Sequence, residues 1–341
     1  MTATPRRRRW WLAWCGVVIA ALLALALRVG GDAWWPVFPL LFGPRWITTS
    51  LVLLPLPLLL TRPRQAMLPL TLAGLLVAVG IMGFRIGPAR LGLGSRSGTS
   101  LRLLEYNVAT SGHVAHLIAG QLDSLGVDVA VLVECPYQSA LVQPRAGWAM
   151  RSAGEICFLS RRPILDWQVR SQDDIWLIHG KASVAEARID VAGQPVAIGM
   201  LHLKSPRDAL IEFRYPSAFP TLGAHVDSIS AIRNLESERA TAFLATPASV
   251  PLIVAGDFNT PVESRIFRRW WSTFSDAFER AGMGIGFTWH SRWYGLRIDH
   301  ILTAHGIRAE RTWIGPDLGS DHVPVIAELS IDRPRRTNGA R

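Results

Sequence analysis

The stretch VAGDFNTP, residues 254–261, places a carboxylate and an amide two positions apart at the end of an apolar run. The run starts at Pro251 and has no charged side chain before Asp257, which is typical of a strand buried on both faces. In α/β folds, the ends of such strands present the side chains that bind ligands. Asp257 and Asn259 are therefore predicted to lie in a functional site.

Six further β-rich apolar runs repeat this pattern. They are LRLLEYN (101–107), VDVAVLVE (127–134), EICFLS (155–160), VAIGMLHL (196–203), LRIDHILT (296–303) and VPVIAELS (323–330). Two helix-like stretches lie between them, at 113–126 and 224–246. Buried strands mixed with amphipathic helices predict an α/β or α+β domain with a packed sheet interior.

Polar side chains recur at the ends of these runs. Each has an ordinary alternative explanation as a turn former, a solvated strand end or a buried histidine. Taken together they comprise four carboxylates, two amides and two imidazoles, which chance does not explain well. The set is Asn107, Glu134, His202, Asp257, Asn259, Asp299, Asp321 and His322.

This mixture of side chains suits the hydrolysis of a phosphate ester. Carboxylate and carbonyl oxygens are the ligands of Mg²⁺ or Mn²⁺, which neutralises charge on the phosphate oxygens. The reaction also needs a base for the attacking water, and a histidine held by a carboxylate can donate to the phosphate. No P-loop, serine nucleophile elbow, Cys/His dyad or dinucleotide fingerprint competes with this interpretation.

Six motifs in order resemble the endonuclease/exonuclease/phosphatase superfamily, which includes deoxyribonucleases, AP endonucleases, neutral sphingomyelinases and inositol-polyphosphate phosphatases. The motifs are LEYN (104–107), VLVE (131–134), LHL (201–203), GDFN (256–259), RIDHIL (297–302) and SDHVPV (320–325). The resemblance covers roughly residues 101–331. It implies a four-layered α/β sandwich of two packed mixed sheets flanked by helices.

The resemblance also implies the metal ligands. Glu134 matches the principal ligand, and Asn107 and Asp321 match positions near the metal or its waters. The chain departs from the pattern at Val133, where many relatives carry glutamine, so an outer-shell amide is missing. Cys135 directly after the glutamate is also unusual.

The catalytic roles follow in the same way. Asp257 matches the residue that orients or deprotonates the attacking water, and Asn259 matches a phosphoryl contact. His322 would bind a phosphate oxygen, with Asp299 as its carboxylate partner. His202 matches the second histidine of the deoxyribonuclease and sphingomyelinase branches. AP endonucleases carry a tyrosine there, which tells against abasic-site repair.

The charge of the chain is divided unevenly. Of 36 basic and 26 acidic residues, residues 1–100 contain eleven arginines and a single acid, Asp32, which leaves 25 of each sign in residues 101–341. A non-specific nucleic-acid-binding domain is expected to be basic, because phosphate contacts supply most of its affinity. The neutral domain therefore disfavours nucleic acid as the partner.

Three charge-free runs precede the domain, at 10–27, 47–60 and 67–84. Each approaches the length that spans a bilayer, so we expect residues 1–84 to be a membrane anchor of three transmembrane helices. Arginines before the first run and between the second and third place the N-terminus in the cytoplasm and the catalytic domain outside it. A cleaved signal peptide is the alternative for the first run.

The remaining boundaries follow from composition. Residues 85–100 are rich in Gly, Ser and Arg and predict a linker, residues 101–332 form the catalytic domain, and residues 333–341 form a basic disordered tail. Cys135 and Cys157 would pair only in an oxidising compartment, and the sequence does not fix their separation.

Three basic residues follow the LHL motif. Lys204, Arg207 and Arg214 could bind a second phosphate or an anionic head group, although an ordinary solvated loop is the slightly favoured interpretation. Thr288, Trp289 and Trp293 could likewise wall a lipid or a ring, or pack under a sheet.

The leading hypothesis is therefore a membrane-anchored phosphohydrolase of the envelope, acting on a phospholipid, a polyprenyl phosphate or another phosphoester. A tethered nuclease and a catalytically silent binding module are the alternatives. No obligate protein partner is evident.

Overall fold

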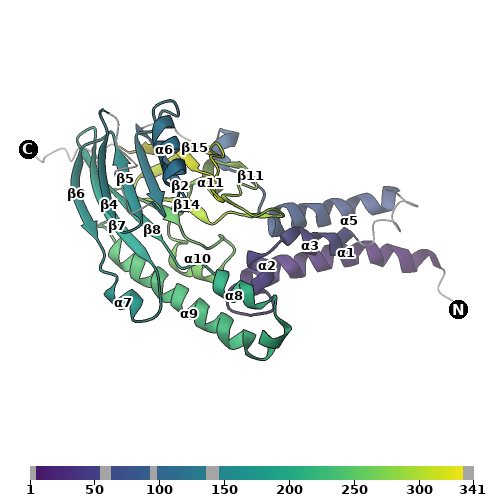
Figure 1. Cartoon of the computed structure of the whole chain (residues 1–341). Coiled ribbons are helices and arrows are strands. Elements are labelled where there is room, and N and C mark those ends of the chain that lie inside the picture. The colour runs from purple at the N-terminus through teal and green to yellow at the C-terminus, as the bar shows by residue number, and fades with distance from the viewer. Residues whose placement is uncertain (1–4, 54–62, 93–97, 136–145, 333–341) are drawn as a thin grey trace, which may run out of the picture.

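The computed structural model describes residues 5–53, 63–92, 98–135 and 146–332. Two six-stranded sheets pack face to face and carry helices on their outer faces (Figure 1). The predicted four-layered α/β sandwich is therefore confirmed. The predicted basic tail, 333–341, lies outside the described residues.

The first sheet has the order β15-β16-β2-β3-β5-β4. Its strands are β2 (Thr99–Asn107), β3 (Val129–Val133), β4 (Ala149–Ala153), β5 (Ile156–Ser160), β15 (Ile307–Ile314) and β16 (Val325–Ile331). Only the β2–β3 pair is parallel, so the sheet is mixed.

The second sheet has the order β10-β14-β9-β8-β7-β6 and is also mixed, with β8 and β9 parallel. Its strands are β6 (Ile164–Val169), β7 (Ser183–Val191), β8 (Gln194–His202), β9 (Leu252–Asp257), β10 (Ser275–Asp276) and β14 (Asp299–Ala304). Two short pairs lie outside the sheets, β1 (Arg85–Ile86) with β11 (Met283–Gly284), and β12 (Trp289–His290) with β13 (Gly295–Leu296).

The core between the sheets is built from aliphatic side chains that alternate inward along the strands. Leu103, Val131 and Phe158 from the first sheet meet Ile198 and Ile253 from the second, all fully buried. Buried apolar area at about 25 cal/mol per Å² makes this layer the main stabilising term. Its close packing fixes the ends of the strands relative to one another.

Helices form the two outer layers. Helix α6 (Gly112–Gln121) covers the first sheet, whereas α9 (Phe219–Phe243) and α10 (Arg265–Trp270) cover the second. Ser111 caps α6 by accepting from the Val114 N–H. The smaller helical segments are α7 (Asp173–Trp176), α8 (Arg207–Glu212), η4 (Pro216–Ala218) and α11 (Ala277–Ala281).

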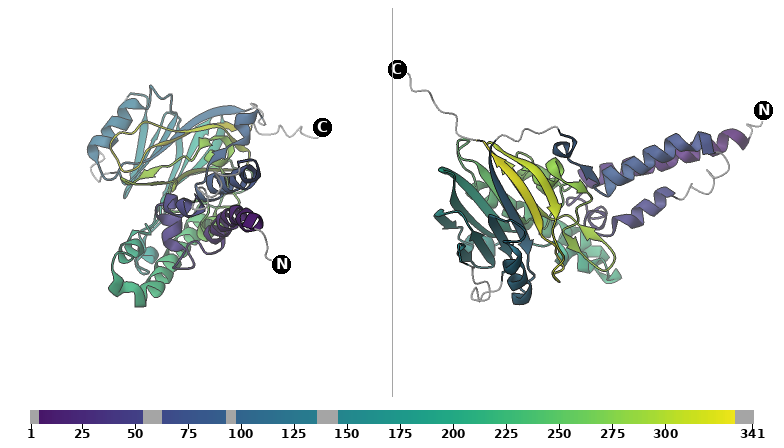
Figure 2. Two further views of the ribbon diagram at one scale, coloured as in Figure 1. Left: turned by 90° about the vertical axis from the view of Figure 1, so that its right-hand side faces the viewer. Right: turned by 90° about the horizontal axis from the view of Figure 1, so that it is seen from above.

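The N-terminal segment is helical. Its elements are α1 (Pro5–Val29), α2 (Phe38–Phe42), α3 (Arg45–Leu53), α5 (Pro63–Leu75), the π-helix η1 (Leu76–Ile81) and the 3₁₀ helix η2 (Pro88–Leu91). Helices α3 and α5 pack against α1, and the group projects from one end of the sandwich (Figure 1, Figure 2).

The predicted membrane spans coincide with α1, with α3, and with α5 and η1, although residues 54–60 of the second span lie outside the described residues. Across the described part of the chain, no helix combines the length and the apolar character that a membrane crossing requires. The described residues therefore do not support the prediction of three transmembrane helices.

The N-terminal helices and the sandwich share a hydrophobic core. Leu27, Phe38 and Phe42 of the N-terminal segment pack with Leu222 and Val226 of α9. Residues 85–91, within the predicted linker, also contact the catalytic domain, because β1 pairs with β11 and η2 packs on α11 and β15. The N-terminal helices are thus packed against the sandwich rather than joined to it by a free tether.

Asp32 makes the most specific of these contacts. Its carboxylate is 1% exposed and accepts hydrogen bonds from the Ser264 hydroxyl and from the backbone N–H groups of Arg265 and Ile266. These N–H groups belong to the first turn of α10, where the chain itself provides no partner. The only acidic residue of the first hundred therefore caps a helix of the catalytic domain.

We expect Asp32→Ala to lower the stability of the full chain by about 1–3 kcal/mol, because the first turn of α10 and the Ser264 hydroxyl lose a buried acceptor. Thermal unfolding of purified full-length protein measures the effect. Asp227→Ala is the matched control, since Asp227 is exposed on α9. Equal unfolding temperatures for the two variants would contradict the assignment.

Candidate active site

Strand pairing places the predicted site residues side by side at one end of the sandwich. His202 pairs with Asp257 across β8 and β9, and Asp299 pairs with Asp257 across β14 and β9. Asn107 ends β2 and Glu134 directly follows β3, its parallel neighbour. Residues separated by up to 192 positions in sequence thus converge because their strands end at the same edge.

Glycine is required at the end of β9. Gly256 has φ +153°, and a Cβ at this position would meet the Leu201 carbonyl oxygen of β8. The missing side chain therefore lets β9 run close to β8 before Asp257. Asn259 and Glu134, which follow β9 and β3, have φ values of +51° and +48°, so the backbone turns away from both strands through a residue in the left-handed conformation.

Asp257 lies at the centre of the site. Its Oδ2 accepts hydrogen bonds from the side-chain amides of Asn107 and Asn259, both at 3.1 Å, and its Oδ1 accepts from the Asn259 N–H at 2.7 Å. The Nε2 atoms of His202 and His322 lie 3.7 Å and 3.9 Å from Oδ2. Asp257 therefore contacts or faces four of the other predicted residues.

Two histidine–carboxylate pairs flank Asp257. His322 Nδ1–H donates to Asp299 Oδ2 at 2.9 Å, and both residues are buried. On the other side, His202 Nδ1–H donates to Glu155 Oε1 at 2.8 Å. Each carboxylate orients a ring so that its Nε2 points towards the centre of the site.

Glu155 was not among the site residues predicted from the sequence. This glutamate directly precedes β5, which runs antiparallel to β3, so its start lies at the same edge as the end of β3. The Ser183 hydroxyl donates to the same oxygen at 2.9 Å. The available signal was a polar residue at the start of the apolar run 155–160.

The pKa values of the site residues follow from the close approach of these buried and charged groups. Burial opposes charge on both histidines, but the Glu155 hydrogen bond and the charge of Asp257 raise the pKa of His202 to about 9. The charge and hydrogen bond of Asp299 likewise raise the pKa of His322 to about 9. Burial and then the charge of Asp299 raise the pKa of Asp257 to about 6. At pH 7 the site therefore holds two imidazolium groups around an aspartate that is close to its protonation point.

Glu105 adds a further buried acid, two residues before Asn107 on the same face of β2. It is fully buried, and among the described residues no group hydrogen-bonds to either of its carboxylate oxygens. Burial and the charges of Asp299 and Asp257 raise its pKa well above the ordinary value. The base of the site is therefore strongly unfavourable to additional negative charge.

The residues fit a divalent cation. Glu134 Oε1 and Asp257 Oδ2 both accept from the single amide nitrogen of Asn107, at 3.1 Å each, so two carboxylates face one donor. Ligand atoms of Asp257, Asp299 and His322 also lie within 4.8 Å of one another. His322 already bonds Asp299, and oxygen is the preferred ligand of Mg²⁺, so the Glu134 side suits that ion better.

Asp321 and the three predicted substrate-binding cations differ in their exposure and in their contacts. Asp321 is exposed and accepts from the Trp289 indole at 3.0 Å. Lys204 is buried and its Nζ lies 3.4 Å from Asp208, whereas Arg207 and Arg214 are exposed. The structure gives Lys204 a partner within the protein and leaves the two arginines facing solvent.

A buried arginine supports the loop that follows Asp257. Arg233 of α9 is 1% exposed and donates to the carbonyl oxygen of Asn259 at 2.7 Å and to the Thr260 hydroxyl. Its guanidinium lies 4.9 Å from the ring centroid of Phe42 in the N-terminal segment. Both Asn259 amide hydrogens are also engaged, by Leu203 O and Asp257 Oδ2. Asn259 therefore braces Asp257 in this structure.

Comparison with known proteins identifies the class. The model of the Endonuclease/Exonuclease/phosphatase family matches residues 104–322, more than half of the chain, and the protein belongs to this family. A search of curated protein sequences finds no match.

Solved structures share the fold. An endonuclease/exonuclease/phosphatase from Beutenbergia cavernae is 17% identical with a TM-score of 0.51, over 69% of this chain and 72% of that chain. Truncated Caenorhabditis elegans TDP2 is 14% identical with a TM-score of 0.52, over 69% and 100%. A family protein from Bacteroides thetaiotaomicron is 15% identical with a TM-score of 0.50, over 70% and 100%. At these identities the likeness is one of fold.

Members of the family hydrolyse phosphoesters, and this is the activity that the fold and the site define at the level of class.

Arg233→Lys should lower kcat about 10–100-fold with little change in KM, because a displaced Asn259 loop shifts Asp257 from its position. The rate is measured on a chromogenic phosphate ester. Arg239→Lys on the same helix is the control, since Arg239 bonds the Asp174 backbone away from the site. A change confined to stability, with kcat retained, would contradict the positioning role.

The two imidazolium groups should also make stability depend on pH. Their folded-state pKa values of about 9 exceed the ordinary 6.5, so their contribution is complete below pH 6.5 and is lost as the pH rises through about 9. In EDTA, the free energy of unfolding should fall between about pH 7 and about pH 10, by at most about 3 kcal/mol per histidine, and the unfolding temperature should fall with it. His322→Gln should reduce this fall, and an equal fall in wild type and variant would contradict the assignment.

Proposed function

We propose that this protein is a divalent-metal-dependent phosphoester hydrolase, held at a membrane and acting outside the cytoplasm on a phosphoester of the cell envelope. The observation that carries the proposal is the placement of Asp257 between two histidine–carboxylate pairs, with Glu134 and Asn107 beside it. The family match supports the reaction class.

Each residue has a defined task in this reaction. Mg²⁺, or Mn²⁺ in its place, would be held by Glu134 and Asn107, and it would neutralise charge on the phosphate oxygens. Asp257 orients the attacking water and accepts its proton, and its raised pKa suits it to this task near neutral pH. The Nε2–H groups of His202 and His322 donate to phosphate oxygens as negative charge develops on them.

Two of these tasks depend on the carboxylates behind the rings, of which Asp299 is buried and Glu155 is partly exposed. Asp299 and Glu155 keep the histidines protonated and fix the ring orientation through Nδ1. Because both rings point at the same side of Asp257, they approach one phosphate from two directions. Asp321, which the resemblance implies near the metal, is proposed to act on its waters from the exposed rim.

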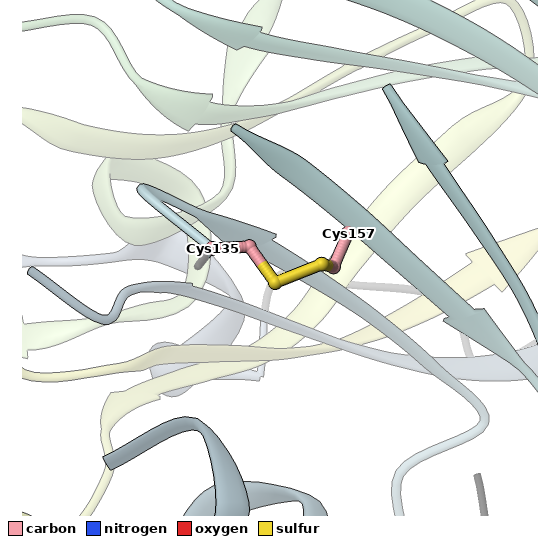
Figure 3. Close-up of a disulfide and its surroundings, with 2 residues drawn as sticks. All are labelled: Cys135 and Cys157. Atoms are coloured by element: carbon pink, nitrogen blue, oxygen red, sulfur yellow. A yellow bond between two sulfur atoms is a disulfide. The ribbon is translucent and has the colours of Figure 1, made fainter. Parts of the chain in front are cut away.

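The disulfide supports a location outside the cytoplasm. Cys135 and Cys157 are bonded, with their Cα atoms 5.8 Å apart, and join the residue after Glu134 to β5 (Figure 3). The Cys135 N–H also donates to the Glu155 carbonyl at 2.8 Å. Disulfides persist in oxidising compartments, so the pairing that the sequence left open favours an extracytoplasmic domain.

The surface of the N-terminal helices supports attachment to a membrane. Large apolar side chains on α1 and α5 are more than half exposed, although a water-facing helix normally presents polar groups. They are Val18, Leu22, Leu25, Val29, Met67, Leu68 and Leu75. A lipid environment would cover this surface, which supports the proposed attachment to a membrane.

Asp257→Ala should lower kcat about 10²–10⁴-fold, because the water loses its base and orienting group. EDTA should abolish the activity of wild type, and added Mg²⁺ should restore it. The assay uses the full chain in lipid nanodiscs, because the N-terminal helices share the core of the sandwich. Bis(p-nitrophenyl) phosphate and p-nitrophenyl phosphate report diester and monoester cleavage, and plasmid nicking reports nuclease activity.

Asp227→Ala is the control for the same assay and should keep full activity. Plasmid nicking at an efficiency equal to or above that of the small esters would favour a tethered nuclease instead. Retained hydrolysis in Asp257→Ala would remove the proposed mechanism. No hydrolysis by wild type with Mg²⁺ or Mn²⁺ would favour a silent binding module.

A further inference from the structure

A short hairpin of β12 and β13 is attached directly to the active site. Trp289 forms a β-bridge with His322, and its indole donates to the Asp321 carboxylate at 3.0 Å. The His290 N–H donates to the Asp321 carbonyl oxygen at 2.8 Å. The base of the hairpin therefore lies against the loop that carries the catalytic histidine.

The other end of the hairpin reaches the N-terminal helices. The indole of Trp46, in the first turn of α3, donates to the Trp293 carbonyl oxygen at 3.1 Å. Within the hairpin, the rings of Trp289 and Tyr294 meet edge to face with centroids 5.6 Å apart. Trp46, Trp289, Trp293 and Tyr294 thus form an aromatic strip from Asp321 to α3.

The outer part of this strip is exposed. Trp293 is 70% exposed and Trp46 48%, and the neighbouring Ile47 of α3 is 50% exposed. The Trp46 indole N–H already has its acceptor, so the exposed part of that side chain is its apolar ring. Exposed tryptophans of this kind are characteristic of membrane–water interfaces and of binding surfaces.

Two arginines flank the strip. The Arg292 guanidinium lies 5.1 Å from the Trp293 ring centroid. Arg214 lies close enough to Tyr294 for its charge to lower the pKa of that phenol, which burial raises. Exposed arginines beside an apolar surface suit a molecule that combines an anionic group with an apolar one.

We propose that the aromatic strip selects an amphiphilic phosphoester, an inference that rests on the proposed function. The phosphate would lie between Asp257 and His322, and the lipid chain would lie along Trp289, Tyr294 and Trp293 towards Trp46. The strip ends at the exposed Trp46 and Ile47 of α3, and α3 packs against α1, whose exposed apolar side chains are proposed to face lipid, so a lipid could reach the site from the membrane. The substrate class is therefore a phosphorylated lipid presented from the membrane.

Exposed aromatic rings and arginines can also bind single-stranded nucleic acid by stacking. Two observations favour the lipid. The strip leads to α3 and its exposed Ile47 rather than to a basic groove. Residues 101–341 also carry equal numbers of basic and acidic residues, whereas nucleic-acid affinity depends on a net positive surface.

The test measures how chain length affects inhibition. Methyl phosphate and dodecyl phosphate, the latter below its micelle concentration, compete with p-nitrophenyl phosphate or bis(p-nitrophenyl) phosphate on the full chain in nanodiscs. Wild type should bind dodecyl phosphate at least about 10-fold more tightly than methyl phosphate, since even two buried CH₂ groups supply this factor. The double variant Trp46→Ala/Trp293→Ala should lose most of that preference, which is read from the ratio of the two inhibition constants.

Trp176→Ala is the matched control, because Trp176 is 63% exposed on α7, at the opposite end of the sandwich from α3 (Figure 1). Unfolding temperatures check that the variants fold. An equal preference in wild type and double variant would overturn the inference while the proposed function stands. A loss of plasmid nicking without a change in chain-length preference would assign the strip to nucleic acid and also overturn it. No hydrolysis of any ester would overturn the proposed function and the inference with it.

Discussion

Repulsion between buried carboxylates is the constraint on which this site depends. Asp257, Asp299 and Glu105 lie within the electrostatic reach of one another and are each at most 1% exposed. Charges at such short range interact strongly away from water, so the arrangement requires positive charge nearby. His322 and His202 provide part of it. A divalent cation beside Glu134 would provide more, and the negative charge of the surrounding carboxylates would favour its binding.

The same repulsion explains why the residues around these carboxylates make so many hydrogen bonds. Repulsion would push the strand ends apart unless other groups held them, and Arg233, Asn107 and Asn259 do so through hydrogen bonds to backbone and carboxylate oxygens. The contacts that hold the strand ends in place extend to the N-terminal segment. Phe42 covers Arg233, and the buried ion pair of Arg45 with Glu263 joins α3 to the segment just after the Asn259 turn. The N-terminal helices therefore help to fix the geometry of the site.

The seven apolar runs of the sequence all became strands, because side chains buried on both faces leave an unbroken apolar signal. Strands β4, β6, β7, β10 and β15 were not predicted. No residue of β4 or β6 is buried, β10 has only two residues, β15 is only partly buried, and β7 carries Glu186 and Arg188 within its buried run. The candidate site residues of the sequence prediction stood out for a similar reason, because each is a polar residue within an apolar run or next to one. Arg233 gave no comparable signal, because an arginine on a long amphipathic helix normally faces water.

Two polar residues of the N-terminal segment make contacts that could not be predicted from the sequence. In the sequence, Arg45 reads as an interruption of an apolar stretch and Asp32 as part of a loop between two spans. Both are buried against residues 263–266, and neither contact can be inferred without knowing that α10 begins there. Burying a charge is costly unless a partner meets it, so these contacts specify one docking position for the helices. That position brings Trp46 to the hairpin beside His322, which connects the apolar helices physically to the chemistry of the site.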